Sequence, residues 1–379
     1  MIGTKKLGKT ALIAAAGLVT AAAIMIFTKP DETPPAATAQ ASAESGEPTS
    51  SPSALPSAPA AETPSPISVK EALAAKYADL GLIDVHNHDA PRYADSLRTW
   101  DRYHVGKVVL FGDISEPSAM LTDAMSWEAY RSYPDRIYPF FSGFDMFKKE
   151  GLQTVRDQLE KGYLGIGETV AASTLSPVLQ NVIWKAEDPM DGNLPDVYAL
   201  CAEYNVPILL HIDPPNGTPV EKLKEALDRY PDTKIIFAHA NAYQGAVAID
   251  DLLEEHSNLY IDFFAGFTSY SISSPYRTEA YIDVIERYPD RFFLSTDGAF
   301  DMTYDEAIPA MYETLEMLKP ETRKKVASGN FQKIIDAEKP TKTQLQRYKE
   351  LGGTEQDVAK LTALSRHEMN KLLFKLGYT

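Results

Sequence analysis

The sequence is poor in cysteine, and this limits the kinds of site it can build. Cys201 is the only cysteine among 379 residues. A single cysteine excludes an intramolecular disulfide and every zinc module built on cysteine pairs. Any metal ion must therefore be held by histidine and carboxylate side chains.

Positive charge is also scarce. The chain has 37 Lys and Arg against 53 Asp and Glu, a formal net charge of −16. A protein that binds nucleic acid or an anionic membrane surface needs a basic face, so this balance argues against both. Apolar residues make up 44% and aromatic residues 10% of the chain, which is enough to bury a core. Length and composition predict one large domain with appendages.

Long apolar runs are rare, and the clearest one lies near the N-terminus. Three lysines precede an uncharged, mostly apolar run at 11–27, so we expect residues 1–29 to be a signal peptide or membrane anchor, preferably uncleaved. A buried core helix is the alternative, but nothing nearby could pack on it. Residues 30–66 are rich in Pro, Ala and Ser and lack aromatic and basic residues, which predicts a disordered linker. The domain beyond would be extracytoplasmic, membrane-anchored or secreted.

Short apolar runs recur eight times in the rest of the chain, with helix-like segments such as 195–204 and 220–230 between them. Eight buried strands that alternate with helices predict a closed (β/α)8 TIM barrel, here over residues 67–338, with an open doubly wound sheet as the alternative. The runs are at 81–88, 107–112, 137–144, 164–170, 207–213, 234–240, 259–265 and 292–298.

Two further segments stand out from this pattern. Residues 171–194 lengthen the connection between the fourth and fifth runs; they are interpreted either as a lid or as a surface insertion without function. Residues 339–379 carry an amphipathic stripe broken by two adjacent glycines. They are predicted to form a helical extension that packs on the barrel or on a partner.

Metal-competent side chains fall at the ends of the predicted strands. The two histidines of the first run are two residues apart, so their side chains project to the same face. The C-terminal ends of barrel strands carry the chemistry of such enzymes, and an ionisable group at the end of a buried strand is costly unless it binds something. The six residues are His86, His88, Glu168, His211, His239 and Asp297.

Together these motifs resemble the amidohydrolase superfamily, in particular its amidohydrolase-related branch, which includes decarboxylases and lactonases. The resemblance covers roughly residues 80–336. The segments that carry it are Ile83-Asp84-Val85-His86-Asn87-His88, Tyr133-Pro134-Asp135-Arg136, Val206-Pro207-Ile208-Leu209-Leu210-His211, Tyr230-Pro231-Asp232-Thr233-Lys234-Ile235-Ile236-Phe237-Ala238-His239, Ser295-Thr296-Asp297 and Gly329-Asn330. The segment after His239, Ala240-Asn241-Ala242, departs from the usual glycine-rich turn.

The resemblance implies a catalytic divalent ion, preferably zinc, with manganese or iron(II) as alternatives. It implies that His86, His88, His211 and Asp297 hold this ion, and that His239 either binds a second ion or polarises the substrate. Glu168 is similar to a bridging glutamate, so one or two ions are expected. If Glu168 bridges a second ion, then His211 and His239 move to that ion. Asp297 is the expected general base.

The preferred function is metal-dependent hydrolysis of a small ester, lactone, amide or phosphoester. Arg92 and Arg277, in loops after the first and seventh runs, are candidate clamps for a carboxylate or phosphate of the substrate, although loop arginines are more often only solvated. The alternatives are a non-oxidative decarboxylase that uses the same ligands and a non-catalytic barrel stabilised by metal. The sequence leaves the oligomeric state open.

Overall fold

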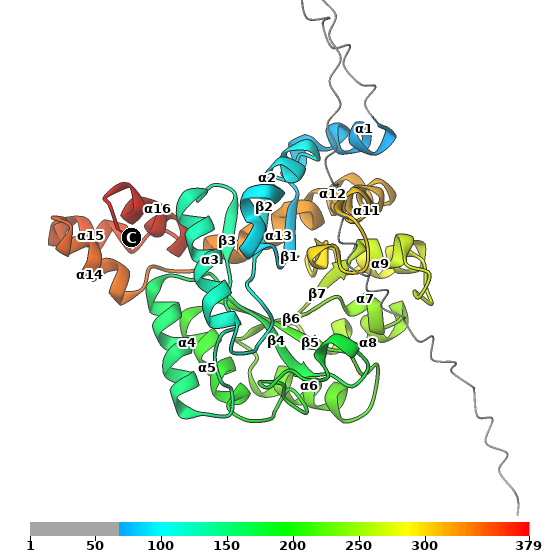
Figure 1. Cartoon of the computed structure of the whole chain (residues 1–379), viewed down its shortest axis with the longest axis horizontal. Coiled ribbons are helices and arrows are strands. Elements are labelled where there is room, and N and C mark those ends of the chain that lie inside the picture. Colours follow the sequence, from blue (N-terminus) through cyan, green and yellow to red (C-terminus); the bar gives the residue numbers. More distant parts are fainter. Residues whose placement is uncertain (1–67, 379) are drawn as a thin grey trace, which may run out of the picture. The chain divides into compact units, whose positions relative to one another are not determined.

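The computed structural model describes residues 68–378 (Figure 1). The predicted segments 1–29 and 30–66 lie outside the described residues. Within residues 68–378, no helix has the length and apolar character needed to cross a bilayer.

Eight parallel strands alternate with helices, which confirms the predicted TIM barrel (Figure 1). The strands pair in sequence order in two groups, β1 to β3 and β4 to β8. Their bounds are β1 Ile83–Asn87, β2 Lys107–Leu110, β3 Ile137–Pro139, β4 Ile166–Ala172, β5 Pro207–Ile212, β6 Lys234–Phe237, β7 Leu259–Phe264 and β8 Phe292–Ser295.

Two seams join these groups of strands. On one side, a single bridge pairs Phe141 with Ile166. On the other side, the first and last strands are tied by side chains: the backbone N–H of Thr296 donates to Asp84 Oδ1 at 2.9 Å, and the Thr296 hydroxyl donates to Asp84 Oδ2 at 2.6 Å. At the first seam, the backbone N–H groups of Leu164 and Gly167 also donate to the carbonyls of Pro139 and Phe141, whereas the seam between β1 and β8 relies on the side chain of Asp84.

Both faces of the strands are buried, which explains why their sequences are largely apolar. Every residue of β4 and β5 is buried, as in a sheet enclosed by helices outside and side chains inside. Close packing at the first seam requires a glycine. A Cβ atom at Gly165 would lie 2.2 Å from the ring of Phe140, so no larger residue fits without displacing that ring.

The helices cover the outside of the strands (Figure 1). α1 begins with a capping box between Ser68 and Glu71, and α5 has a proline in its first turn, both common starts for a helix. The α-helices up to residue 337 are α1 Val69–Lys76, α2 Tyr93–Arg102, α3 Ala119–Ser132, α4 Lys149–Lys161, α5 Leu194–Tyr204, α6 Thr218–Arg229, α7 Ala240–Tyr243, α8 Ala246–Glu255, α9 Ala265–Tyr270, α10 Ile282–Arg287, α11 Tyr304–Met317, α12 Pro320–Lys324 and α13 Asn330–Ala337.

The predicted C-terminal helical extension is present and packs on the barrel. It comprises α14 Lys342–Glu350, α15 Glu355–Leu361 and α16 Arg366–Lys375, beside α3 and α4 in Figure 1. Arg366 is 1% exposed, donates to the carbonyls of Tyr163 and Tyr204, and faces buried Glu338 at 3.6 Å. Because Tyr163 and Tyr204 precede β4 and β5, the extension covers the N-terminal ends of these strands and leaves their C-terminal ends free.

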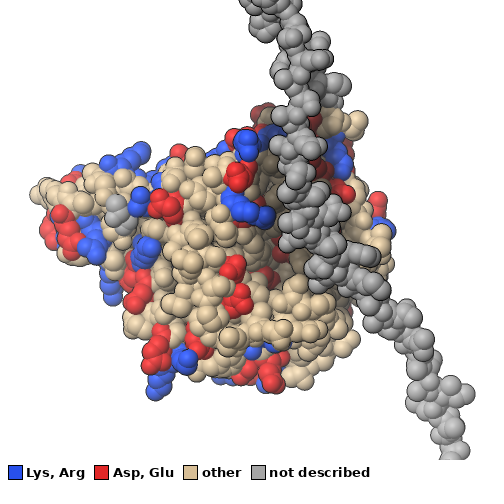
Figure 2. Space-filling model, in the orientation of Figure 1, with Lys and Arg blue, Asp and Glu red and all other residues tan. Residues whose placement is uncertain are grey.

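Charged side chains of both signs are interspersed over the visible face of the molecule (Figure 2). Among the described residues on this face, no continuous basic area appears. The mixed charges on this face agree with the acidic composition of the chain.

Candidate metal centre

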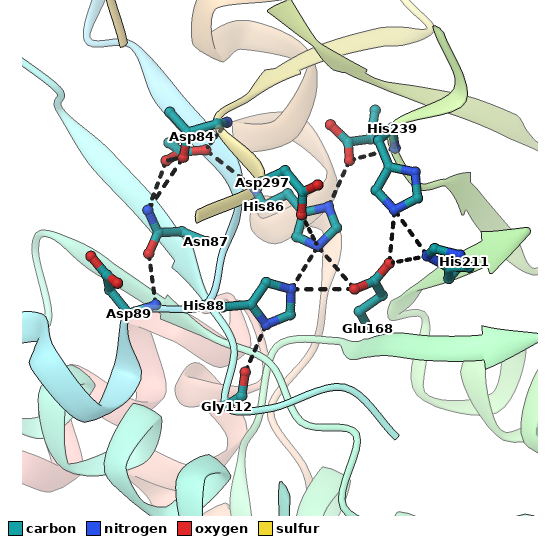
Figure 3. Close-up of polar contacts among 12 residues, drawn as sticks. Asp84, His86, Asn87, His88, Asp89, Gly112, Glu168, His211, His239 and Asp297 are labelled. Atoms are coloured by element: carbon teal, nitrogen blue, oxygen red, sulfur yellow. Dashed lines mark hydrogen bonds and ion pairs between the residues drawn. The ribbon is translucent and has the colours of Figure 1, made fainter. Parts of the chain in front are cut away.

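The six metal-competent residues meet at the C-terminal ends of the strands (Figure 3). They come from five strands: His86 and His88 from β1 and its end, Glu168 from β4, His211 from β5, His239 directly after β6, and Asp297 directly after β8. All are buried or nearly so; His88 is the most accessible, with 25% of its side chain exposed.

Four of these residues form a first donor group: His86, His88, Glu168 and Asp297. His88 Nδ1 lies 2.7 Å from the carbonyl oxygen of Gly112, and His86 Nδ1 lies 2.8 Å from Asp262 Oδ2. Because those oxygens can only accept, both Nδ1 atoms carry the hydrogen of a neutral ring. The two Nε2 atoms, 3.0 Å apart, therefore point their lone pairs at each other.

Carboxylate oxygens complete this arrangement of lone pairs. Glu168 Oε2 lies 3.2 Å from His88 Nε2 and 3.4 Å from His86 Nε2, and Asp297 Oδ1 lies 3.5 Å from His86 Nε2. Two ligand atoms bound tetrahedrally to one zinc ion are about 3.4 Å apart. Only a cation can stabilise four acceptors that converge in this way, so the donor set fits a divalent metal ion.

A second donor group contains Glu168, His211 and His239. Glu168 Oε1 lies 3.0 Å from His211 Nδ1 and 2.9 Å from His239 Nε2, and these two nitrogens are 3.1 Å apart. Glu168 thus turns one oxygen to each group. The grouping differs from the single-ion set of His86, His88, His211 and Asp297 and has the arrangement expected for two ions bridged by Glu168.

The pKa values of the site residues reflect how closely the carboxylates and imidazoles lie to one another. Burial raises the pKa of Glu168, but the imidazoles of His86, His211 and His239 outweigh burial and hold it well below its ordinary value. Burial lowers the pKa of His211, but hydrogen bonds to Asp213 and Glu168 raise it to about 9. Negative charge at Glu168 and Asp213 thus favours cations in this site, and a metal ion would compete with the protonation of His211.

Two buried carboxylates that the sequence analysis missed orient the ligands. Asp262, fully buried in β7, accepts from His86 Nδ1 and, at 2.9 Å, from the backbone N–H of His239, so one oxygen atom contacts both donor groups. Asp213 lies 3.4 Å from His211 Nε2 and accepts three backbone N–H groups of the loop after β4. The sequence did carry a feature that could have identified Asp262: it is an ionisable residue inside an otherwise apolar run.

A cavity of about 380 Å³ opens above the donor groups. His88, Glu168, His211, His239 and Asp297 form part of its wall. Residues Ser176, Val178 and Leu179 place the start of the long connection after β4 against the cavity, as a lid would lie.

The two predicted substrate arginines lie in different surroundings. Arg92 lines the cavity, but its guanidinium donates to Asp89 Oδ1 at 2.9 Å, and 73% of its side chain is exposed. Arg277 precedes a short 3-10 helix, donates to the carbonyl of Ser271 at 3.2 Å, and is not among the residues that line the cavity. The structure therefore brings Arg92 near the donor groups and leaves Arg277 outside the cavity.

Comparisons with known proteins bear on the family and the fold. Residues 69–334 match the family model described as amidohydrolase. No curated protein sequence matches the chain.

Solved structures give weak matches over most of the barrel. An uncharacterized TIM-barrel protein from Bordetella bronchiseptica is 16% identical, with a TM-score of 0.47, over 67% of this chain and 97% of that one. A probable 2-pyrone-4,6-dicarboxylic acid hydrolase from Acinetobacter baumannii is 15% identical, with a TM-score of 0.45, over 67% and 98%. A 2,6-dihydroxybenzoate decarboxylase from Rhizobium is 16% identical, with a TM-score of 0.46, over 67% and 98%. At these values the matches do not bear on the reaction.

Proposed function

Because the chain belongs to the amidohydrolase family, we propose that it is a metal-dependent hydrolase that cleaves a small ester, lactone, amide or phosphoester with water. One observation carries the proposal: Glu168 presents one oxygen to each of two donor groups at the floor of an open cavity. His86, His88, Glu168 and Asp297 would hold one divalent ion, and Glu168, His211 and His239 would hold a second.

A divalent ion in such a site supplies Lewis acidity, which activates water and polarises the scissile bond. The chain itself handles the proton. Asp297 lines the cavity, and its side chain is 16% exposed, so it can receive a proton from water and return it to the leaving group. Asp262 keeps His86 in the tautomer that directs Nε2 to the cation.

The ligand types favour zinc. The donors are imidazoles and carboxylates without thiolates, which zinc accepts readily and which manganese and iron(II) also accept. Metal analysis of the purified protein, and reconstitution of the metal-free protein with each ion in turn, would identify the ion that supports turnover.

The test measures bound metal and turnover together in the full-length protein. We expect about two ions per chain and hydrolysis of at least one member of an ester, lactone and phosphodiester panel. Glu168→Ala should lower the stoichiometry to about one or less and abolish turnover. The matched control is Asp123→Asn, a buried carboxylate outside both donor groups, which should keep both ions.

Three results would contradict the proposal. A stoichiometry near one that Glu168→Ala leaves unchanged would remove the two-ion site. Full metal content in His86→Ala would show that the ions do not bind at these residues. Release of carbon dioxide from aromatic or unsaturated acids, without hydrolysis of the panel, would replace the hydrolase by a decarboxylase.

A further inference from the structure

The cavity wall has chemically different parts, because different loops of the barrel build it. Loops after β1 and β2 supply charged residues. Loops after β4, β6, β7 and β8 supply apolar and aromatic residues. Strand order places the first two loops next to each other, so the charges gather on one side of the cavity.

The charged side is acidic. Arg92 is the only Lys or Arg among the lining residues, and its charge is offset by Asp89 at 2.9 Å. Asp113 and Glu116 follow β2 and are half-buried. Within residues 68–378, neither of these two carboxylates forms an ion pair with Lys, Arg or His. Glu116 Oε1 accepts from the Ser118 hydroxyl at 2.7 Å, which does not neutralise its charge, so both carboxylates add negative charge to this part of the cavity wall.

Another part of the cavity wall carries apolar and aromatic side chains. Tyr243 stands beside the second donor group, with its ring centroid 6.0 Å from that of His211 and 5.6 Å from that of His239. Phe267 lines the same side. At the mouth, Phe300 and Val178 line the cavity and are 52% and 63% exposed, so they offer apolar surface that a ligand could cover.

We infer that this cavity selects a substrate with an aromatic or apolar body and an amine or uncharged polar end, and that it rejects carboxylate- and phosphate-bearing substrates. The body packs against Tyr243, Phe267 and Phe300, and the polar end faces Asp113 and Glu116. The inference rests on the proposed function and narrows it. It removes the anionic phosphoesters and reverses the expectation that Arg92 clamps an anion.

The preference for an amine over a carboxylate end group depends on repulsion of the carboxylate as well as on attraction of the amine. An anionic end group would meet Asp113 and Glu116 in a partly enclosed site, where charges are screened less than in open solvent. The contact with Asp89 already offsets the charge of Arg92, which reduces its attraction for an anionic end group. We therefore expect affinity to follow the order amine, uncharged, carboxylate.

The experiment measures binding to the metal-loaded, full-length protein by calorimetry, independently of turnover. The probes are benzohydroxamate and its 4-aminomethyl and 4-carboxy derivatives, which share one metal-chelating group and one aromatic ring. We expect the aminomethyl probe to bind about tenfold more tightly than the carboxy probe, and higher salt to reduce this ratio. In the double variant Asp113→Asn/Glu116→Gln, the ratio should fall to about twofold or less.

Two variants separate the acidic side from other causes. Glu221→Gln/Asp232→Asn changes the net charge equally at exposed residues outside the cavity and should keep the wild-type ratio. Phe300→Ala should weaken all three probes by about threefold or more and leave their order unchanged, because it removes only apolar contact.

The outcomes distinguish this inference from the proposed function. A carboxy probe that binds as tightly as the aminomethyl probe, or a ratio that the Asp113/Glu116 double variant leaves unchanged, overturns the inference. Failure of all three probes to bind overturns it together with the metal centre. The expected order without turnover of any ester, lactone or amide supports the inference and overturns the proposed hydrolysis alone.

Discussion

Replacing Asp262 by asparagine keeps the size of the side chain and removes its negative charge. Oδ2 of Asp262 accepts from His86 Nδ1 at 2.8 Å and from the backbone N–H of His239 at 2.9 Å. Asp262 itself does not line the cavity. Any effect on metal binding must therefore pass through the two histidines that it orients.

The expected loss of metal affinity follows from the hydrogen bond between His86 and residue 262, which the substitution weakens. A hydrogen bond to a charged group contributes about 1.5–3 kcal/mol, whereas a neutral one contributes about 0.5–1.5 kcal/mol. The difference of about 1–2 kcal/mol corresponds to a loss of roughly 5- to 30-fold in metal affinity, within the range of roughly 10- to 100-fold known for groups behind a ligand. We expect Asp262→Asn to weaken zinc binding by about tenfold.

The assay is competition for zinc between the protein and a chromophoric chelator, with thermal unfolding of the metal-free protein measured alongside. Asp123→Asn is the matched control, because Asp123 is buried and also accepts two backbone N–H groups, those of Ser142 and Gly143, but contacts no donor residue. Zinc affinity within about twofold of wild type in Asp262→Asn, with unfolding lowered as in the control, would refute the orienting role.

Three other predictions concern the fold and the metal. Chelation should lower the melting temperature by several degrees and abolish turnover, and added zinc should restore both; unchanged melting would argue against ions that span the barrel. Burial beside Lys371 and Lys107 lowers the pKa of His367 to about 4, so the metal-free protein should lose about 3 kcal/mol of stability as pH falls from about 6.5 to 4. In His367→Gln, the free energy of unfolding measured by chemical denaturation should fall less over this pH range. A pH profile identical to that of the wild type would contradict the role of His367. Gly165→Ala should cost about 1–3 kcal/mol by denaturant titration, because its Cβ meets the Phe140 ring at 2.2 Å; wild-type stability would show that the ring moves freely.

The barrel could be predicted from sequence because its strands are buried on both faces. Such strands leave continuous apolar runs. Seven of the eight observed strands lie within their predicted runs, and β4 extends two residues past its run, to Ala172. The C-terminal extension was visible as an amphipathic stripe. Its place at the N-terminal ends of the strands was not, because that depends on Arg366 reaching the carbonyls of Tyr163 and Tyr204 across long stretches of chain.

The sequence predicted which six residues form the site, but not how they divide into two donor groups. Strand ends fix which side chains meet, whereas the partition of ligands depends on local backbone. His239 and Asp297 both adopt left-handed backbone conformations, with φ of 34° and 48°, which no residue pattern announces. Asp262 was missed because it lies inside β7 rather than at its end, and the sequence analysis looked at strand ends. The predicted anchor and linker at 1–66 remain predictions.

The seam between β1 and β8, which the side chain of Asp84 ties together, gives metal binding a second consequence. His86 and His88 belong to the first group of strands, and Glu168 and Asp297 belong to the second, so an ion shared among them would act as a clasp between the two halves. A chain deprived of metal would lose this clasp as well as its reactivity. It would open first where β1 leaves β8 and expose its leading strands to proteases, so empty molecules would be degraded while loaded ones persist.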